Sequence, residues 1–382
     1  MQTSMRMPWG FACALMFALV AIADAHAGAA FGRDDQAIVE RVDAAAKAEI
    51  AKDSVGSVTV GVVSKGSLIW TKSYGFADAE KKILATADTI YRIGSITKQF
   101  TALMLLQLVE RGKVHLSDPA RTYLPAIDLV QGRYASAAPV TLLQLATHTS
   151  GLDREPEGSK YSVGSVSSWE KTLDNALPHT RYAYEPGTQY SYSNVGYAIL
   201  GAALERAARQ SYVDYIRQNV LTPLGMSDTS FEVTDQQIAR VAKGYVVDRG
   251  KVDFARSEAD QRNGRGYRVP NGSLYTTVGD LAKFMGYEMG FGPQSVLKKE
   301  SIDANWKRIV VSDGTFEKGY GVGFMSERFG DTTLYGHSGL VTGYQAQAFF
   351  DRKSQIGVIV LSNSKGGAFD GFNVLSAAFQ TH

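Results

Sequence analysis

The chain has 382 residues, of which 45% are hydrophobic, so it can bury a sizeable core and is not a small disulfide-stapled domain. Its 40 Lys and Arg against 38 Asp and Glu leave a formal net charge of +2, which excludes the broad positive field of a nucleic-acid-binding protein. A single Cys and six scattered His exclude a disulfide framework and zinc-ligand spacing. We therefore expect no metal ion and no organic cofactor.

Residues 1–27 are typical of an export signal peptide. Arg6 gives a weakly positive start, residues 11–23 are apolar, and either Ala23-Asp24-Ala25 or Ala25-His26-Ala27 offers a cleavage site. The apolar run is too short to cross a bilayer, so we expect a periplasmic or secreted protein without a membrane span in its mature chain. The alternative is a retained N-terminal anchor.

Helix and strand patterns follow each other in the next part of the chain. Residues 35–51 carry an apolar stripe at helical spacing, which predicts an amphipathic helix. Residues 58–63 and 68–76 flank a Gly-containing turn and predict a β-hairpin. Residues 97–109 are apolar on nearly every side, which predicts a buried helix.

The rest of the chain is first helical and then rich in strands. Residues 142–289 show helical segments joined by Gly, Pro, Ser and Tyr-rich loops, and strand patterns return between 320 and 361 before an amphipathic segment at 369–379. We predict an α+β fold, with an antiparallel sheet built from both chain ends, helices flanking it and an inserted all-α lobe. The predicted boundaries are a single two-lobed domain at 28–382, with an α/β lobe at about 31–100 and 290–382 and a helical lobe at about 101–289.

A serine and a lysine three positions apart lie where the chain enters the predicted buried helix, in Gly94-Ser95-Ile96-Thr97-Lys98. Positions i and i+3 share a helix face, so the Ser95 hydroxyl and the Lys98 amine can meet. Burial should lower the pKa of Lys98, and a neutral amine can accept the proton of a serine nucleophile. Three other serines have lysine at this spacing, but none opens a long buried helix. The alternative is that Ser95 only caps the helix.

A second motif is Tyr192-Ser193-Asn194, in the loop before a predicted helix at 196–208. Asn194 can offer a donor and an acceptor to an amide, and Tyr192 can shuttle a proton if nearby cations depress its pKa. The alternative is that Asn194 caps the helix while Tyr192 packs among other tyrosines.

A third motif ends a predicted strand with the residues His337, Ser338, Gly339 and Leu340. Small residues let an extended substrate lie along a strand edge, where backbone N–H groups can bind a carbonyl oxygen. Such an edge could complete an oxyanion hole. The alternative is that His337 is a hydrogen-bonded histidine at a strand end, without a catalytic role.

Taken in order, these three motifs resemble the serine β-lactamase and penicillin-binding superfamily, in particular its class C β-lactamase-like branch of DD-peptidases, esterases and D-amino-acid amidases. The likeness covers about residues 35–379 and includes segments without obvious chemistry at 142–152, 223–226 and 272–277. It implies the β-lactamase and DD-peptidase fold.

The resemblance also implies roles for the residues of the motifs. Ser95 would be the acylated nucleophile, Lys98 its deprotonating or orienting neighbour, and Tyr192 a general base and acid. Asn194 would bind the amide of the substrate. The third motif would contribute His337 to catalysis and Ser338, Gly339 and Leu340 to substrate binding, with the backbone N–H groups of Ser95 and Leu340 forming the oxyanion hole. We interpret His148, in Thr-His-Thr-Ser-Gly, as structural.

One departure from the family pattern bears on the substrate. The lactamases of this branch usually have Lys where this chain has His337, and the histidine resembles the DD-peptidase and esterase members. We therefore expect an exported serine hydrolase of DD-peptidase or esterase type, acting on a D-Ala-D-Ala peptide, an ester or a β-lactam. The alternatives are a β-lactamase of class C type and a non-catalytic sensor that binds penicillin or muropeptides. An α/β-hydrolase is excluded, because no serine has the flanking glycines of Gly-x-Ser-x-Gly.

Residues 246–268 are rich in charges of both signs. A guanidinium in this stretch could hold a substrate carboxylate. Because the opposite charges alternate, we interpret the stretch as a solvated surface loop.

Overall fold

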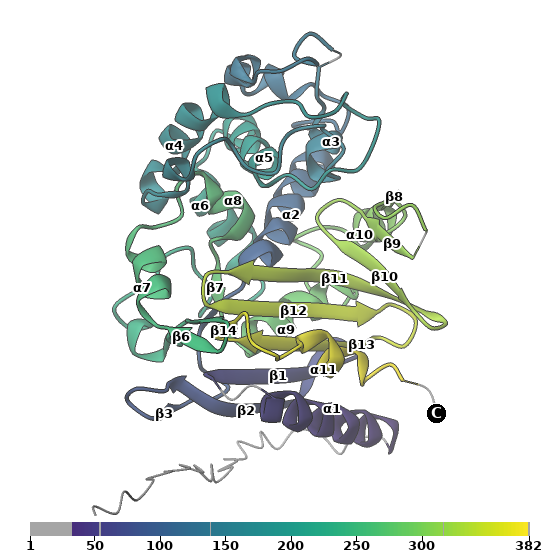
Figure 1. The fold of residues 1–382 in the computed structure, drawn as a ribbon. Helices are drawn as coiled ribbons and strands as arrows, with labels where there is room; N and C mark the ends of the chain where they lie inside the picture. Colours follow the sequence, from purple (N-terminus) through teal and green to yellow (C-terminus); the bar gives the residue numbers. More distant parts are fainter. Residues whose placement is uncertain (1–32, 53–54, 138, 316, 381–382) are drawn as a thin grey trace, which may run out of the picture.

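The computed structural model describes residues 33–52, 55–137, 139–315 and 317–380 (Figure 1). The predicted signal peptide at 1–27 lies outside the described residues. Within the described ranges, no helix combines the length and the apolar character that a membrane span requires.

A large antiparallel sheet joins the two ends of the chain. Its strands run in the order β3-β2-β1-β13-β12-β11-β10-β9-β8, and β1 pairs with β13 in a register that sets Val60 opposite Val360. The strands are β1 Ser57–Ser64, β2 Ser67–Asp78, β3 Ile83–Leu84, β8 Val310–Val311, β9 Lys318–Tyr320, β10 Met325–Phe329, β11 Thr332–Val341, β12 Tyr344–Asp351 and β13 Ile356–Ser362. The predicted hairpin and the predicted antiparallel sheet from both chain ends are confirmed.

Helices cover both faces of this sheet, which explains why its central strands are apolar on both sides. All eight residues of β1 and all seven of β13 are buried. Helices α1 (Arg33–Lys52) and α11 (Gly371–Ser376) pack on one face, and α9 (Val278–Glu288) packs on the other (Figure 1). A strand that is covered on both faces needs hydrophobic residues at consecutive positions.

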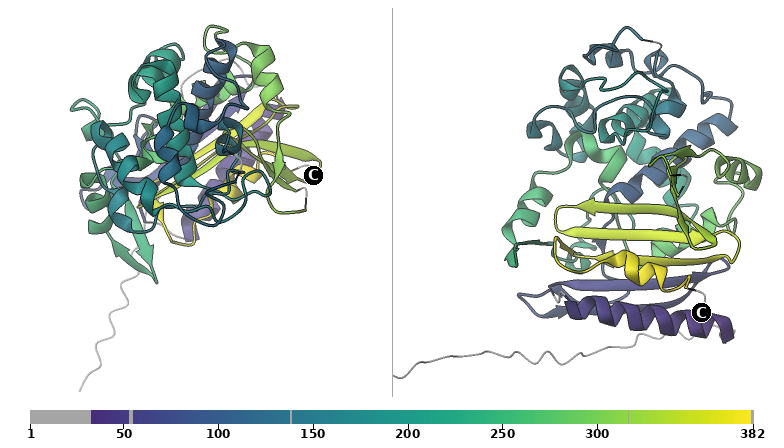
Figure 2. Two further views of the ribbon diagram at one scale, coloured as in Figure 1. Left: turned by 90° about the horizontal axis from the view of Figure 1, so that it is seen from above. Right: turned by 45° about the vertical axis from the view of Figure 1, so that its right-hand side comes forward.

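A mostly helical half lies beyond the β11 side of the sheet (Figure 2, right). Its central helix α2 (Thr97–Glu110) is buried from Thr97 through Leu108, as its apolar pattern predicts, and packs against α5 (Asn194–Ala208) and α8 (Val269–Gly272). The other helices are α3 Leu142–Ala146, α4 Trp169–Ala176, α6 Tyr212–Ile216, α7 Ala255–Arg262 and α10 Lys299–Asn305. The predicted α+β class with a large helical insertion is confirmed.

The structure differs from the prediction in two details of the middle segment. Strands β5 (Tyr245–Asp248) and β6 (Lys251–Asp253) form a small sheet with β14 (Ser364–Lys365), and β7 (Tyr275–Thr276) pairs with β4 (Tyr91–Arg92). Helix α9, which the prediction assigned to the helical lobe, packs on the sheet instead. Strands of two to four residues are too short to show a period, and an apolar helix face does not reveal whether a sheet or a helix covers it.

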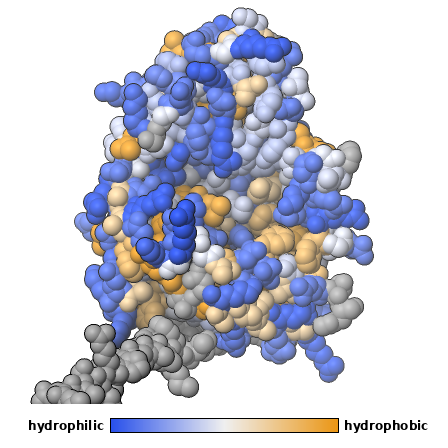
Figure 3. All heavy atoms as spheres, viewed as in Figure 1, coloured by the Kyte–Doolittle hydropathy of each residue, from blue (hydrophilic) through white to orange (hydrophobic). Residues whose placement is uncertain are grey.

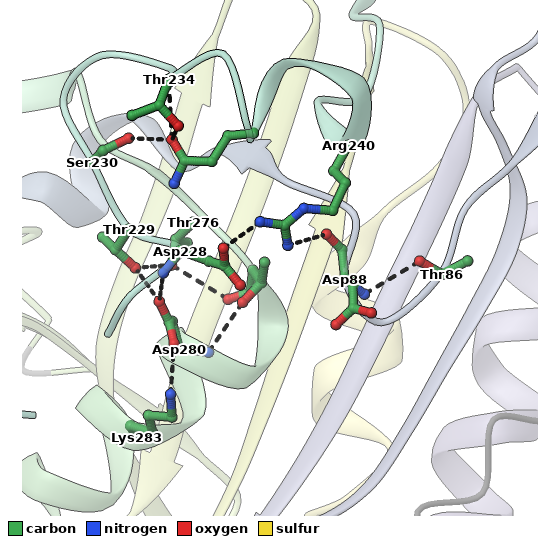
Figure 4. A network of polar contacts seen from close by, with 12 residues as sticks. Thr86, Asp88, Asp228, Thr229, Ser230, Thr234, Arg240, Thr276, Asp280 and Lys283 are labelled. Carbon is green, nitrogen blue, oxygen red and sulfur yellow. Dashed lines mark hydrogen bonds and ion pairs between the residues drawn. The ribbon is translucent and has the colours of Figure 1, made fainter. Parts of the chain in front are cut away.

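A polar network ties the segment before α7 to the start of α9 (Figure 4). The Asp280 carboxylate accepts hydrogen bonds from the Asp228 backbone N–H at 2.8 Å and from the Thr229 hydroxyl at 2.9 Å. Arg240 pairs with Asp228 and also donates to the Asp88 carbonyl oxygen at 3.4 Å. These contacts link the loops on this side of the molecule to the helix that covers the sheet.

Candidate active site

Ser95 lies where the helical half meets the sheet. It stands in the 3₁₀ turn Gly94–Ile96, which runs directly into α2 and packs against β11. Neither the turn nor α2 has a side-chain cap hydrogen bond at its start, so Ser95 does not act as a helix cap. The capping alternative is therefore wrong, and the Ser95 hydroxyl is free to make the contacts described next.

Lys98 is fully buried and its amine joins three groups. Its Nζ lies 3.0 Å from Ser95 Oγ, 2.8 Å from Asn194 Oδ1 and 2.9 Å from the carbonyl oxygen of Asn271. Burial lowers the pKa of Lys98 well below its usual value, and neighbouring arginines lower it further, while Glu155 opposes the shift. The predicted meeting of Ser95 and Lys98 on one helix face is confirmed, as is the direction of the pKa shift.

Glu155 fixes which way the Asn194 amide points. Its carboxylate accepts a hydrogen bond from Asn194 Nδ2 at 2.6 Å, and since a carboxylate only accepts, the amide oxygen must face Lys98. Lys98 therefore has two obligate acceptors, Asn194 Oδ1 and the Asn271 carbonyl. A neutral amine has two N–H groups for these acceptors and a lone pair left for the Ser95 hydroxyl.

The side chain of Asn194 is not a helix cap, so this alternative is also wrong. Ser193 caps α5 by accepting a hydrogen bond from the Gly196 N–H, while the Asn194 side chain lies between Lys98 and Glu155. One hydrogen of Asn194 Nδ2 remains for a ligand after the bond to Glu155 is made.

Tyr192 contacts the same centre from the other side. The Lys98 amine and the Arg154 guanidinium lie 4.9 Å and 4.7 Å from the centre of its ring, and the Ser95 hydroxyl is close enough to favour the charged form of its phenol. Burial nevertheless raises the pKa of Tyr192, and the neighbouring Ser95 hydroxyl and the charge of Arg154 only partly offset this. The condition set for a proton shuttle, a pKa depressed by nearby cations, is therefore not met in the free protein, because desolvation outweighs the cations. Tyr192 is therefore a phenol, and not a phenolate, at neutral pH.

His148 packs against the loop that carries Tyr192. Its Nδ1 accepts a hydrogen bond from the Ser193 N–H at 3.0 Å, and its ring lies 4.1 Å from the Tyr192 ring between centroids. The side chain is completely buried. These contacts agree with the structural interpretation of His148, which holds the backbone between Tyr192 and Asn194.

The third motif approaches Ser95 through two glycines. A Cβ on Gly94, whose φ is +51°, would lie 2.9 Å from the Leu340 nitrogen, and a Cβ on Gly339 would lie 1.8 Å from the Ile93 carbonyl oxygen. The paired part of β11 and β10 ends at Gly336, so the edge of β11 beyond it faces the Ser95 turn. The Ser95 nitrogen lies close to this edge too, since a Cβ on Gly339 would be 3.2 Å from it, so the backbone nitrogens of Ser95 and Leu340 are near each other.

Gly339→Ala should separate this edge from the nucleophile. The added Cβ collides with backbone, which cannot rotate away, so we expect a loss of stability of about 1–3 kcal/mol and at least a roughly hundredfold loss of ester hydrolysis. Gly279→Ala is the matched control, since its Cβ would meet only Thr277 Oγ1 at 3.9 Å. Thermal unfolding and steady-state kinetics measure both effects, and a fully active Gly339→Ala would contradict the close approach.

His337 lies beside this centre and bonds to other groups. Its Nε2 is 2.9 Å from the Tyr320 hydroxyl and its Nδ1 is 2.5 Å from the Ser338 carbonyl oxygen. Since a carbonyl only accepts, Nδ1 carries the proton and Nε2 accepts from Tyr320. The Tyr192 ring is 6.4 Å away between centroids. The structure thus brings Ser95, Lys98, Tyr192 and Asn194 together and leaves His337 outside their hydrogen bonds.

Side chains on the third motif alternate between two faces of β11. His337 is buried towards Tyr320, whereas the Ser338 hydroxyl contacts the sulfur of Met325 at 3.7 Å and Leu340 is 59% exposed. The Ser338 side chain is therefore directed to Met325, and only the Ser338 backbone lies along the predicted substrate edge.

His337 should stay neutral throughout the physiological pH range. Burial and the nearby Lys98 lower the pKa of His337 to about 3, so the folded chain holds it uncharged while the unfolded chain binds a proton below about pH 6.5. Its contribution to stability is therefore complete above about pH 6.5 and is lost as the pH falls towards 3. Histidine NMR titration should show no transition for His337 between pH 5 and 8, and a midpoint within that range would contradict the geometry.

A charged cluster adjoins Asn194, and its Glu155 was not predicted from the sequence. Glu155 also accepts from the Tyr267 hydroxyl and pairs with Arg268 at 3.0 Å. Glu155 and Arg268 line a cavity of about 500 Å³, to which Asp260 also contributes. The charged stretch at 246–268 is thus only partly a solvated surface, because Arg265 keeps just 11% of its side-chain exposure.

Figure 3 shows hydrophobic surface across the middle of this side of the molecule, below the more hydrophilic helical half.

No group of three or more His, Cys, Asp or Glu side chains in the described part of the chain is placed to hold a metal ion.

The sheet, the helical half and the Ser95 centre together define the fold of the β-lactamase and penicillin-binding superfamily. The Beta-lactamase family profile matches residues 38–381, and the chain belongs to this family. Protein flp of Staphylococcus aureus strain NCTC 8325 is 25% identical over 325 residues, and β-lactamase-like protein 2 of Dictyostelium discoideum is 26% identical over 336 residues. These matches cover 85% and 86% of this chain but only 63% and 59% of the relatives, so the chain spans about three fifths of their length.

Solved structures confirm the fold. The octameric penicillin-binding protein homologue of Pyrococcus abyssi has a TM-score of 0.74 and 27% identity, over 89% of this chain and 76% of that one. The D-amino acid amidase of Ochrobactrum anthropi SV3 has a TM-score of 0.73 and 24% identity, over 89% and 98% of the two chains. A class C β-lactamase has a TM-score of 0.74 and 20% identity, over 92% and 98%.

Proposed function

We propose that the protein is a serine hydrolase that cleaves an amide or an ester through an acyl-enzyme on Ser95. The observation that carries this proposal is the 3.0 Å contact between the Ser95 hydroxyl and a buried lysine whose other two partners accept hydrogen bonds. A buried neutral amine next to a hydroxyl is a proton acceptor for a nucleophile.

Acylation follows from this arrangement. The Ser95 hydroxyl proton passes to the Lys98 nitrogen as Ser95 Oγ bonds to the substrate carbonyl carbon. The carbonyl oxygen becomes an oxyanion between the N–H groups of Ser95 and Leu340. Collapse of this intermediate breaks the bond to the leaving group, which takes a proton from the Tyr192 hydroxyl. The proton held by Lys98 then passes to the Tyr192 phenolate, whose ring centre lies 4.9 Å from the Lys98 nitrogen, and both groups return to their starting states.

Deacylation reverses the same transfers. Tyr192 gives its proton to Lys98 and accepts a proton from the water molecule that attacks the acyl carbon. Lys98 then protonates Ser95 Oγ as the acyl bond breaks. Asn194 keeps one free N–H for the carbonyl group of the substrate, while its oxygen holds Lys98 in place. In this scheme His337 is a positioning residue, which fixes the edge of β11 through Tyr320.

We infer a DD-peptidase or esterase type of activity, on a D-Ala-D-Ala peptide or an ester. This rests on a neutral His337 at the position where the lactamases of this branch usually carry lysine, so no cation from the third motif faces the site. The name of the Pyrococcus abyssi relative supports penicillins as acylating probes of Ser95. A class C type β-lactamase and a non-catalytic penicillin or muropeptide sensor are the alternatives.

We further propose that the protein is exported, to the periplasm or the medium, by the signal predicted at residues 1–27. N-terminal sequencing of protein from the extracytoplasmic fraction tests this proposal. Cleavage after Ala25 or Ala27 supports it, and an intact Met1 in a cytoplasmic fraction contradicts it.

Turnover of a chromogenic ester tests the proposed activity. A hydrolase releases product continuously after any burst, whereas a sensor releases one equivalent and stops. The same assay with a D-Ala-D-Ala peptide and a cephalosporin ranks the substrates by kcat/KM. Release of a single equivalent from all three would contradict the hydrolase and favour the sensor.

A further inference from the structure

Two arginines near the site share a single carboxylate oxygen. Asp260 Oδ2 lies 2.7 Å from Arg92 Nη1 and 3.3 Å from Arg265 Nη1. Each guanidinium has five N–H donors, so one carboxylate cannot satisfy both. Among the residues that the structure describes, the Nε and Nη2 atoms of Arg92 and the Nε atom of Arg265 are buried and find no hydrogen-bond partner.

Positive charge exceeds negative charge around this pair. Arg268 is balanced by Glu155, but Lys365 also lies near the cluster. Burial, Arg256 and Arg265 lower the pKa of Lys365, and Asp260 only partly opposes this shift. Burial and the charge of Arg92 lower the pKa of Arg265 to about 10. One more negative charge would therefore be stabilised at this position.

The two arginines differ in what surrounds them. Arg92 is 1% exposed and lies over the rings of Tyr275 and Tyr344, at 5.6 Å and 5.9 Å, so it is a structural member of the core. Arg265 keeps 11% of its side-chain exposure, and its Nη2 makes no hydrogen bond in the described part of the chain. Arg265 is the member of the pair that a ligand could reach.

The free end of Arg265 points to the nucleophile's turn. A Cβ on Gly272 would lie 3.4 Å from Arg265 Nη2 and 3.8 Å from the backbone carbon of Gly94. The absence of a side chain at Gly272 thus leaves Arg265 Nη2 next to the backbone that carries Ser95. A substrate group bound there would be close enough to the carbonyl attacked by Ser95 to belong to the same substrate molecule.

We propose that Arg265 forms an anion subsite beside Ser95 that binds a carboxylate of the substrate. The planar edge of a guanidinium can donate two parallel hydrogen bonds to a carboxylate. Because Arg92 and Arg265 share the single charge of Asp260, the carboxylate of a ligand would supply a second negative charge. This inference rests on the proposed hydrolase function and narrows its substrates to esters or amides that carry a carboxylate, in either the acyl part or the leaving group.

Binding to the Ser95→Ala protein tests the subsite without any need for turnover. Two pairs of compounds serve as probes: succinanilic acid against butyranilide places the carboxylate in the acyl part, and N-acetyl-D-Ala-D-Ala against its C-terminal amide places it in the leaving group. Calorimetry at fixed salt should show that the charged member of one pair binds about tenfold more tightly or better, as expected of a charge-assisted hydrogen bond.

Variants show whether Arg265 causes a preference for the charged compound. Adding Arg265→Met should remove the preference and leave the affinity for the neutral compound unchanged, while Arg265→Lys should retain part of it. Arg262→Met is the matched control, since Arg262 is 70% exposed and pairs with Glu258. Asp260 keeps its bond to Arg92 in the Arg265→Met protein, and a melting curve checks that it folds.

The outcomes separate this proposal from the proposed function. Equal binding within both pairs, or a preference that survives Arg265→Met in folded protein, overturns the subsite. A preference that Arg265→Met removes supports it, even if the wild-type protein turns over no ester, in which case only the hydrolase function fails.

Discussion

Lys98→Ala should lower kcat/KM for an ester substrate by at least about a thousandfold. The change removes the amine that accepts the Ser95 proton and leaves Asn194 Oδ1 and the Asn271 carbonyl without their shared donor. Because the pKa of Lys98 is lowered, wild-type activity should rise with pH as this group loses its proton, well below the usual lysine range. Steady-state kinetics between pH 5 and 9 measures the loss of kcat/KM in Lys98→Ala and the pH dependence of the wild-type protein.

Two further variants make this result specific. Lys98→Arg keeps the charge but cannot lose its proton near neutral pH, so it should be as inactive as Lys98→Ala. Lys283→Ala removes an exposed lysine that pairs with Asp280 and should leave the rate unchanged. An active Lys98→Arg protein would show that the lysine only orients Ser95 and does not accept its proton.

Tyr192→Phe should lower kcat by about a hundredfold to ten-thousandfold, since it removes only the hydroxyl that protonates the leaving group. The raised pKa of Tyr192 keeps the phenol protonated in the free protein, as this role requires. The loss should be greatest for amides and smallest for nitrophenyl esters, whose leaving groups need no proton. A series of esters with leaving groups of rising pKa measures this dependence.

Tyr190→Phe is the matched control for this change. Tyr190 is a neighbouring ring in the same loop, 5.9 Å from Tyr320 between centroids, and nothing in the mechanism uses its hydroxyl. We expect near-normal activity from it. If Tyr192→Phe were equally active on amides, Tyr192 would not be the acid.

The sequence predicted the centre well where the chemistry depends on short spacing. Ser95 and Lys98 are three residues apart where the turn Gly94–Ile96 runs into α2, so their contact follows from local helical geometry. The antiparallel sheet from both chain ends followed from strand patterns at 58–76 and 345–361.

What the sequence did not predict depends on tertiary contacts. Glu155 sits in an ordinary charged run, and only the fold brings it to Asn194. The pKa of Tyr192 required knowing that burial outweighs Arg154, and a motif carries no information on desolvation. Arg265 belongs to a stretch of alternating charge that is typical of solvated surface, although the fold buries most of its side chain against Asp260.

Covalent labelling of Ser95 tests the account most directly. Full-length protein incubated with a penicillin or a fluorophosphonate should gain the mass of one adduct, and peptide mapping should place that adduct on Ser95. The Ser95→Ala protein, whose fold is checked by its melting curve, should gain no adduct. An adduct on any other residue, or labelling that survives Ser95→Ala, would contradict an acyl-enzyme at this serine.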